Sequence, residues 1–179
     1  MVPSSVFAAS LEPLAKNITI AQTARGIIIS HDPDARGVFF GLSAIHTKRD
    51  MLRAVMEGVA YSLRDCFEIC REMGIDISDM TACGGGGTSS LWRQMLADLY
   101  KCPVKTSASK EGPALGAAIL AAVGAGIYSS VPEACSAIVK TDKTQQPISE
   151  NIPKYDSCYK LYTEIYPALK DKFKVLANL

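Results

Sequence analysis

The chain has 179 residues, of which 48% are hydrophobic and 21% charged, and its formal net charge at neutral pH is +1. This length predicts a single globular domain over residues 1–179, because the chain can bury a core and is too short for two domains of ordinary size. The near-zero net charge gives no support for a nucleic-acid or anionic-membrane partner. No apolar run approaches the ~20 residues of a membrane span.

The cysteines and the N-terminus point to a reducing compartment. The first sixteen residues lack the basic start and long apolar centre of a secretory signal. The six cysteines are scattered without a CxxC pair. Cys66 and Cys70 are spaced to share one helix face, but no second pair or nearby histidine completes a metal site. We therefore expect buried, reduced thiols, no metal site and a cytoplasmic location.

The first half of the chain predicts two strands and one long helix. The β-branched run at 26–30 and the apolar run at 38–42 read as strands on either side of a turn. Thr47 and Asp50 have the spacing of a helix start, and Gly74 that of a helix end, which predicts a helix from Lys48 to Met73. Its expected buried face consists of Leu52, Val55, Met56, Val59, Leu63, Cys66, Phe67 and Cys70.

The second half alternates strands and helices. Strands are predicted at 80–83 and within 101–106, and a helix carrying Leu91 to Leu99 lies between them, capped by one of residues 88–90. Gly112-Pro113 opens a thin Ala-rich helix, and Ser130 begins another. A loop or hairpin is expected at 140–153, followed by a helix over 153–179 whose tyrosines form a packing face. This order predicts an α/β domain with a sheet covered by helices.

The most informative segment is the run of four glycines from Gly84 to Gly87, between a strand and a helix. Glycine permits positive φ and lets another group approach the main chain closely. At the mouth of a helix, a loop of this kind presents free N–H groups and the positive end of the dipole to an anion or nucleotide. A tight turn without a ligand is the alternative.

Known phosphate loops and catalytic motifs fit this segment poorly. A Walker A loop needs a lysine after its last glycine, but Thr88 follows Gly87. A dinucleotide fingerprint needs a third glycine where this chain has Ser89. It also needs an acid about 20 residues later, where the chain has residues 107–109, which include no acid. A dehydrogenase fragment is therefore a weak alternative. There is no Gly-x-Ser-x-Gly motif, and neither His31 nor His46 has the setting of a base. No catalytic residue is predicted.

Two separated segments together resemble the C-terminal domain of the FGGY carbohydrate kinases. The first is Gly37-x-Phe39-x-Gly41-Leu42, followed after seven residues by Asp50-Met51-x-x-Ala54-Val55-Met56-Glu57. The second joins Gly84-Gly85-Gly86-Gly87-x-Ser89-x-x-Trp92-Arg93-Gln94 to Glu111-Gly112-Pro113-Ala114-x-Gly116-Ala117-Ala118. The resemblance covers residues 31–139 and is strongest to members that act on D-xylulose, whereas residues 1–30 are atypical.

The resemblance implies an actin-like (ribonuclease-H-like) ATPase fold with a mixed sheet, forming the C-terminal half of a two-domain sugar kinase. In that family the sugar binds mainly to the N-terminal domain and ATP, with Mg²⁺, mainly to the C-terminal one. It implies that Gly84, Gly85, Gly86 and Gly87 carry the adenosine and α-phosphate. Ser90 would lie near the nucleotide, and Glu111 and Gly112 would start the helix that walls the adenine. Glu57 is expected to be structural or interdomain and not catalytic.

The family's Asp-x-Gly-Thr phosphate loop and its general-base aspartate have no counterpart in this sequence. We therefore expect the ATP-binding part of a kinase for a ketopentose such as D-xylulose, inactive when isolated. The alternative is a non-catalytic nucleotide-binding or dimerisation module of the same fold, which would form a homodimer.

Overall fold

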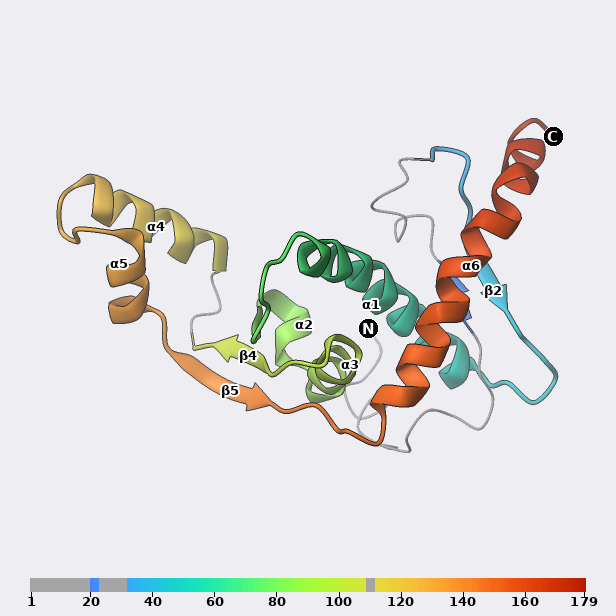
Figure 1. Ribbon diagram of the computed structural model, residues 1–179, viewed down its shortest axis with the longest axis horizontal. Coiled ribbons are helices and arrows are strands. Elements are labelled where there is room, and N and C mark those ends of the chain that lie inside the picture. The colour runs from blue at the N-terminus through green and yellow to red at the C-terminus, as the bar shows by residue number, and fades with distance from the viewer. Residues whose placement is uncertain (1–19, 23–31, 109–111) are drawn as a thin grey trace.

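The computed structural model describes residues 20–22, 32–108 and 112–179. The strand expected at 26–30 and the predicted site residue Glu111 lie outside the described residues. Helices α1 (Lys48–Glu72), α3 (Ser90–Tyr100) and α6 (Ile152–Ala177) pack together, and α3 also covers a small sheet. Figure 1 shows helices α4 (Gly112–Gly124) and α5 (Val131–Ile138) projecting beyond the end of that sheet, away from the other helices.

The sheet is mixed, as predicted. Strand β3 (Met80–Ala82) runs parallel to β4 (Val104–Ser107), and β5 (Thr141–Gln145) lies antiparallel along the other side of β4. A second, antiparallel pair joins β1 (Ile20–Gln22) to β2 (Val38–Phe40) and packs against α1. The position of β2 confirms the strand expected at 38–42.

The expectation of a loop or hairpin at 140–153 was wrong in its first part. Residues 141–145 form β5, which pairs with β4 far away in the sequence and not with a neighbouring strand. The main-chain N–H of Lys143 also donates to Oγ1 of Thr106, at 3.1 Å. Four of the five residues of β5 are exposed. A strand at a solvated sheet edge needs no apolar alternation, which is why its sequence resembles a loop.

Local signals set the ends of α1 as expected. Oδ2 of Asp50 accepts hydrogen bonds from both the N–H and the hydroxyl of Thr47, each at 2.7 Å, and this satisfies a donor that the helix start leaves free. At the other end the helix stops at Glu72, and Gly74 adopts a φ of 78°, which an L side chain rarely tolerates.

The predicted buried face of α1 was wrong. None of the eight side chains expected there is fully buried, and Leu52 and Val59 are exposed. The residues buried instead are Ala54, Glu57, Gly58, Ala60, Tyr61, Ser62 and Arg64. The helical spacing was predicted correctly, but the buried face lies at a different angle around the axis of α1. The inward side carries small residues together with charged groups that contact α6. Met56, Leu63 and Phe67 pack at the margin of the core.

The core lies between α1, α3 and α6 and is rich in tyrosine. Tyr155 and Tyr162 of α6 are buried, which confirms the predicted packing face of the last helix. The ring of Tyr100 stacks on Phe67 with 4.3 Å between centroids, and its hydroxyl donates to the carbonyl oxygen of Ala60 at 3.1 Å. The rings of Tyr100 and Tyr155 remove a large apolar area from water while their hydroxyls keep a polar partner.

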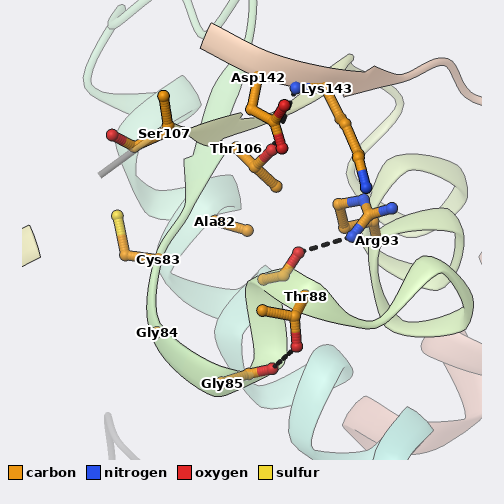
Figure 2. A pocket seen from close by; sticks show the side chains of 12 residues that line it. Ala82, Cys83, Gly84, Gly85, Thr88, Arg93, Thr106, Ser107, Asp142 and Lys143 are labelled. Atoms are coloured by element: carbon orange, nitrogen blue, oxygen red, sulfur yellow. Dashed lines mark hydrogen bonds between the residues drawn. The ribbon is translucent and has the colours of Figure 1, made fainter. Parts of the chain in front are cut away.

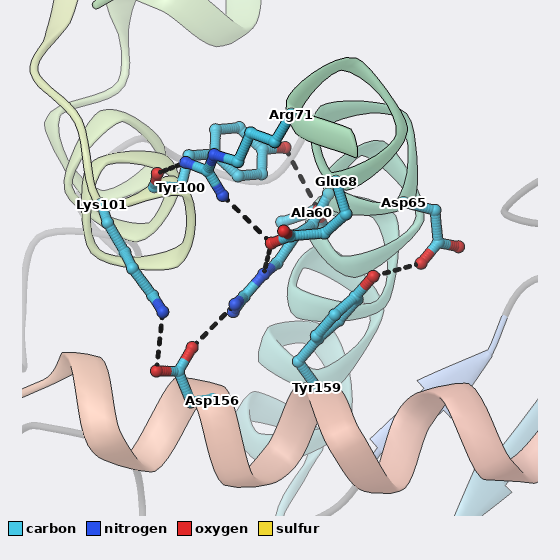
Figure 3. Close-up of polar contacts among 9 residues, drawn as sticks. Ala60, Asp65, Glu68, Arg71, Tyr100, Lys101, Asp156 and Tyr159 are labelled. Atoms are coloured by element: carbon cyan, nitrogen blue, oxygen red, sulfur yellow. Dashed lines mark hydrogen bonds and ion pairs between the residues drawn. The ribbon is translucent and has the colours of Figure 1, made fainter. Parts of the chain in front are cut away.

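Polar contacts fix α6 across the other two helices (Figure 3). Asp156 accepts from Nη2 of Arg64 at 2.7 Å and pairs with Nζ of Lys101 at 2.9 Å. The hydroxyl of Tyr159 donates to Asp65 at 2.7 Å, and the Arg64 guanidinium lies 4.2 Å from the centre of the Tyr159 ring. Burial raises the pKa of Asp156, but the bonds from Lys101 and Arg64 outweigh it, so the pKa lies below its usual value of 3.8.

Asp98 of α3 anchors the segment that leads into α6. Its side chain is buried, with Oδ1 accepting from the amide of Gln94 and from the N–H of Ile148, both at 2.7 Å. Oδ2 accepts from the side-chain amide of Asn151, also at 2.7 Å. One carboxylate thus satisfies three donors and holds the start of α6 against α3.

The pair α4–α5 is packed very differently. Helix α4 is apolar along its whole length, yet Ile119 is its one buried residue and the side chain of Leu120 is 63% exposed. Ser130 caps α5 as predicted, its Oγ accepting from the N–H of Glu133 at 3.4 Å. Within the described residues, no helix combines the length and the hydropathy that a membrane crossing requires.

Candidate nucleotide site

The glycine segment is a single helical turn and not the open loop that was expected. Helix α2 (Gly84–Thr88) begins with Gly84 at a φ of 69°. Ser89 is extended, ends α2 and caps α3 by accepting from the N–H of Trp92 at 3.3 Å. The hydroxyl of Thr88 closes the turn onto the carbonyl oxygen of Gly85, at 2.7 Å. A helix of one turn has too few aligned peptides for a strong dipole, so the expected dipole contribution is small.

Packing or backbone conformation constrains three of the four glycines, each for a different reason. A Cβ at Gly87 would lie 2.6 Å from the carbonyl oxygen of Ala82, so only glycine lets α2 sit this close to β3. A Cβ at Gly86 would press on the ring of Trp92 at 3.3 Å, and Gly84 needs its positive φ. Gly85 has neither constraint, because a Cβ there would meet nothing within 4 Å. Its bare backbone therefore faces open space that packing does not explain.

Gly85 is also one of the residues that line a pocket of about 320 Å³ between α2 and the sheet (Figure 2). This volume lies within the usual range of small-molecule sites. Its walls come from β3, α2, α3, β4 and β5. The lining residues are Ala82, Cys83, Gly84, Gly85, Gly87, Thr88, Arg93, Thr106, Ser107, Ala108, Asp142 and Lys143.

Basic side chains line one wall of this pocket. Arg93 of α3 is 6% exposed, and its Nη1 donates to the carbonyl oxygen of Gly87 at 2.6 Å, which also fixes the end of α2. Figure 2 shows the side chain of Lys143 reaching from β5 toward the Arg93 guanidinium. Asp142 lies beside Lys143 and contributes the one carboxylate of the lining.

The structure brings some of the predicted site residues together and leaves others apart. Gly84, Gly85 and Gly87 line the pocket, whereas Gly86 is turned toward Trp92. Gly112, at the start of α4, lies beside Cys83, since a Cβ there would contact that cysteine's Cβ at 3.4 Å. Ser90 is exposed on the first turn of α3 and is not part of the lining.

Sequence reasoning missed the contribution of the sheet. Thr106 on β4 and Lys143 on β5 line the pocket because these strands pair, and nothing local in the sequence signals that pairing. Arg93 was noted only as part of a family motif.

Glu57, expected to be structural, lies away from this pocket. It pairs with Arg53 at 2.8 Å, and Nη2 of Arg53 donates to the Tyr155 hydroxyl at 3.2 Å. Burial raises the pKa of Glu57 in spite of the bond from Arg53. The carboxylate thus helps to join α1 to α6.

The described residues contain no group of three or more His, Cys, Asp or Glu side chains placed to hold a metal ion. All six cysteines lie in the described residues and none forms a disulfide. The expectation that they are buried was wrong for most of them, because only Cys102 and Cys158 are buried and Cys83 is exposed.

Comparisons with known proteins identify the family of the chain. Residues 3–125 match the C-terminal domain of the FGGY family of carbohydrate kinases. A xylulose kinase of Staphylococcus epidermidis is 40% identical over 139 residues, which are 78% of this chain and 28% of that protein. A gluconokinase of Bacillus subtilis is 32% identical over 82% of this chain and 29% of its own length. The chain therefore spans under a third of the length of these relatives.

A solved structure confirms the predicted fold class. The crystal structure of xylulose kinase from Rhodospirillum rubrum superposes with a TM-score of 0.74 at 29% identity, over 87% of this chain and 31% of that one. With its mixed sheet, helical cover and signature segments in these places, the chain belongs to the FGGY family of carbohydrate kinases.

Proposed function

We propose that this chain is the C-terminal, nucleotide-binding part of an FGGY sugar kinase. The observation that carries the proposal is the open backbone at Gly85, which lines a pocket of small-molecule size and lies close to Gly87, where packing demands glycine. A glycine that packing does not require leaves room for a ligand to lie against the main chain.

ATP fits the residues at this site. Gly84, Gly85 and Gly87 would hold the adenosine, Gly112 and the start of α4 would form a second wall, and Arg93 and Lys143 would face its phosphate end. Bound ATP would supply the phosphoryl group. Mg²⁺ would arrive with the nucleotide, because the described residues offer it no cluster of ligands.

The substrate of the whole enzyme is proposed to be a ketopentose such as D-xylulose. The 40% identity to a xylulose kinase, against 32% to a gluconokinase, favours this choice. Phosphoryl transfer also needs a base to accept the proton of the attacking sugar hydroxyl. We place that base and the sugar site on the N-terminal domain that the family resemblance implies, and we propose that the enzyme works in the cytoplasm.

Titration calorimetry of the purified chain tests this function. We expect ATP and adenosine to bind and NADH to bind more weakly, and we expect no ATP-dependent phosphorylation of D-xylulose by the chain alone. Tighter binding of NADH than of ATP would favour a dinucleotide site instead. Turnover by the isolated chain would contradict the placement of the base.

The exposed apolar surface of α4 favours a second candidate, a dimerisation module of the same fold. A surface helix normally exposes a polar face, whereas α4 exposes Leu120 among alanines and glycines. Light scattering distinguishes the two possibilities, because this candidate requires a dimer at micromolar concentration and a concentrated monomer would exclude it.

A further inference from the structure

Arg93 is a buried cation with no counter-ion in the described part of the chain. It is 6% exposed. Among the described residues its side chain makes one hydrogen bond, to the neutral carbonyl oxygen of Gly87, and its Nε has no partner. No ion pair to Arg93 is present in the part of the chain that the structure describes. A guanidinium removed from water is costly unless an anion compensates its charge, so this arrangement is incomplete as it stands.

A second cation converges on the same point. Lys143 extends from β5 so that its ammonium approaches the Arg93 guanidinium (Figure 2), and it too has no ion pair among the described residues. Asp142, which also lines the pocket, pairs with neither of them. Two like charges directed into one pocket repel each other unless an anion lies between them.

We propose that Arg93 and Lys143 hold a phosphate group in this pocket, and that in the kinase it is the phosphate attached to the adenosine that Gly85 carries. The second half of this statement rests on the proposed function. A guanidinium and an ammonium on one wall suit the several oxygens of a phosphate. Lys143 lies beyond residue 125, where the match to the family domain ends, so this contact comes from outside the matched region.

Calorimetry on the full 179-residue chain, with adenosine, AMP and inorganic phosphate as ligands, tests the proposal. The variant is Lys143→Gln, and the matched control is Lys140→Gln, an exposed lysine that precedes β5 and does not line the pocket. We expect AMP to bind about tenfold more tightly than adenosine, the usual effect of a charged hydrogen bond. Lys143→Gln should remove this gain and leave adenosine unchanged, Lys143→Arg should restore it, and Lys140→Gln should keep it.

The outcomes separate this inference from the proposed function. Equal affinity for adenosine and AMP, or a gain that survives Lys143→Gln, overturns the phosphate contact and leaves the nucleoside site standing. Inorganic phosphate that binds only when Lys143 is present, with no binding of adenosine, supports the phosphate contact and overturns the nucleotide function. Failure of all three ligands to bind overturns both.

Discussion

A comparison of the core helices with the projecting pair α4–α5 shows that the apolar content of a helix does not by itself decide whether its side chains are buried. Helix α4 is nearly all Ala, Leu, Ile, Val and Gly, yet it buries one side chain. Helices α1 and α6 carry many charged residues, yet they enclose the core with Arg64, Glu57 and Tyr155 inside it. The difference lies in partners, since the charged residues of the core find each other across helices while α4 packs mainly on α5.

The largest expected effect compares one substitution in both regions. Leu99 is fully buried in α3, and Leu99→Ala should lower the free energy of unfolding by about 2–5 kcal/mol through the cavity it leaves. Leu120 is 63% exposed on α4, and Leu120→Ala should change it by less than about 0.5 kcal/mol. Urea denaturation measures both. Similar losses for the two variants would mean that α4 is buried in solution.

Asp98→Ala should lower the free energy of unfolding by about 3 kcal/mol, because it removes a carboxylate that accepts from three donors, two of which hold the start of α6. The same measurement on Asp171→Ala is the control, since that side chain is 93% exposed and should contribute nearly nothing. A small loss at Asp98 would mean that the polar contacts of the core are dispensable.

Two glycines of α2 should respond with opposite signs. Gly87→Ala should destabilise the fold by about 2 kcal/mol, because its Cβ would be forced against the carbonyl oxygen of Ala82. Gly85→Ala should leave stability unchanged or raise it by up to ~1 kcal/mol, since alanine favours the helix and has space. Thermal unfolding gives the stabilities and calorimetry gives the adenosine affinity, which Gly85→Ala should lower. Unchanged affinity would mean that Gly85 only forms part of the turn and does not contact the ligand.

The smallest effect is a pH dependence within the core. Asp156 has a pKa below its usual 3.8 in the folded protein, so its pairing stabilises the fold above that pH and is lost as the pH falls through the lower, folded-state pKa. Asp156→Asn should cost about 1 kcal/mol at pH 7, because the carboxylate is partly exposed. The variant and the original chain should converge in urea titrations once the pH falls below the folded-state pKa of Asp156, which itself lies under 3.8. A difference that persists there would not be electrostatic.

Signals that act within one turn of helix were readable from the sequence. The Thr47–Asp50 box, the stop at Gly74 and the cap at Ser130 depend on neighbouring residues, and each lies where it was expected. The buried face of α1 was not readable, because Arg64 enters the core through Asp156, 92 residues away. Charged residues look like surface until their partners are known.

The candidate site also has one part that local sequence predicted and another part that depends on contacts between distant segments. The glycines and Gly112 were found from their local pattern and the family resemblance, and the structure brings Gly112 to Cys83 beside the turn. No sequence signal distinguishes Gly87, which is fixed by contact, from Gly85, which is open. Lys143 and Thr106 enter the pocket through the pairing of β4 with β5, a contact between segments more than thirty residues apart.

Strand β3 lies at the edge of its sheet, and this has a consequence for exchange with solvent. The N–H of Met80 points inward to the carbonyl oxygen of Pro103, so the alternation of a strand turns the N–H of Thr81 outward. An outward amide on an edge strand is a natural point of attachment for another strand. Deuterium uptake at Thr81 should therefore be fast in this chain, and slow in any longer kinase whose sheet continues past β3.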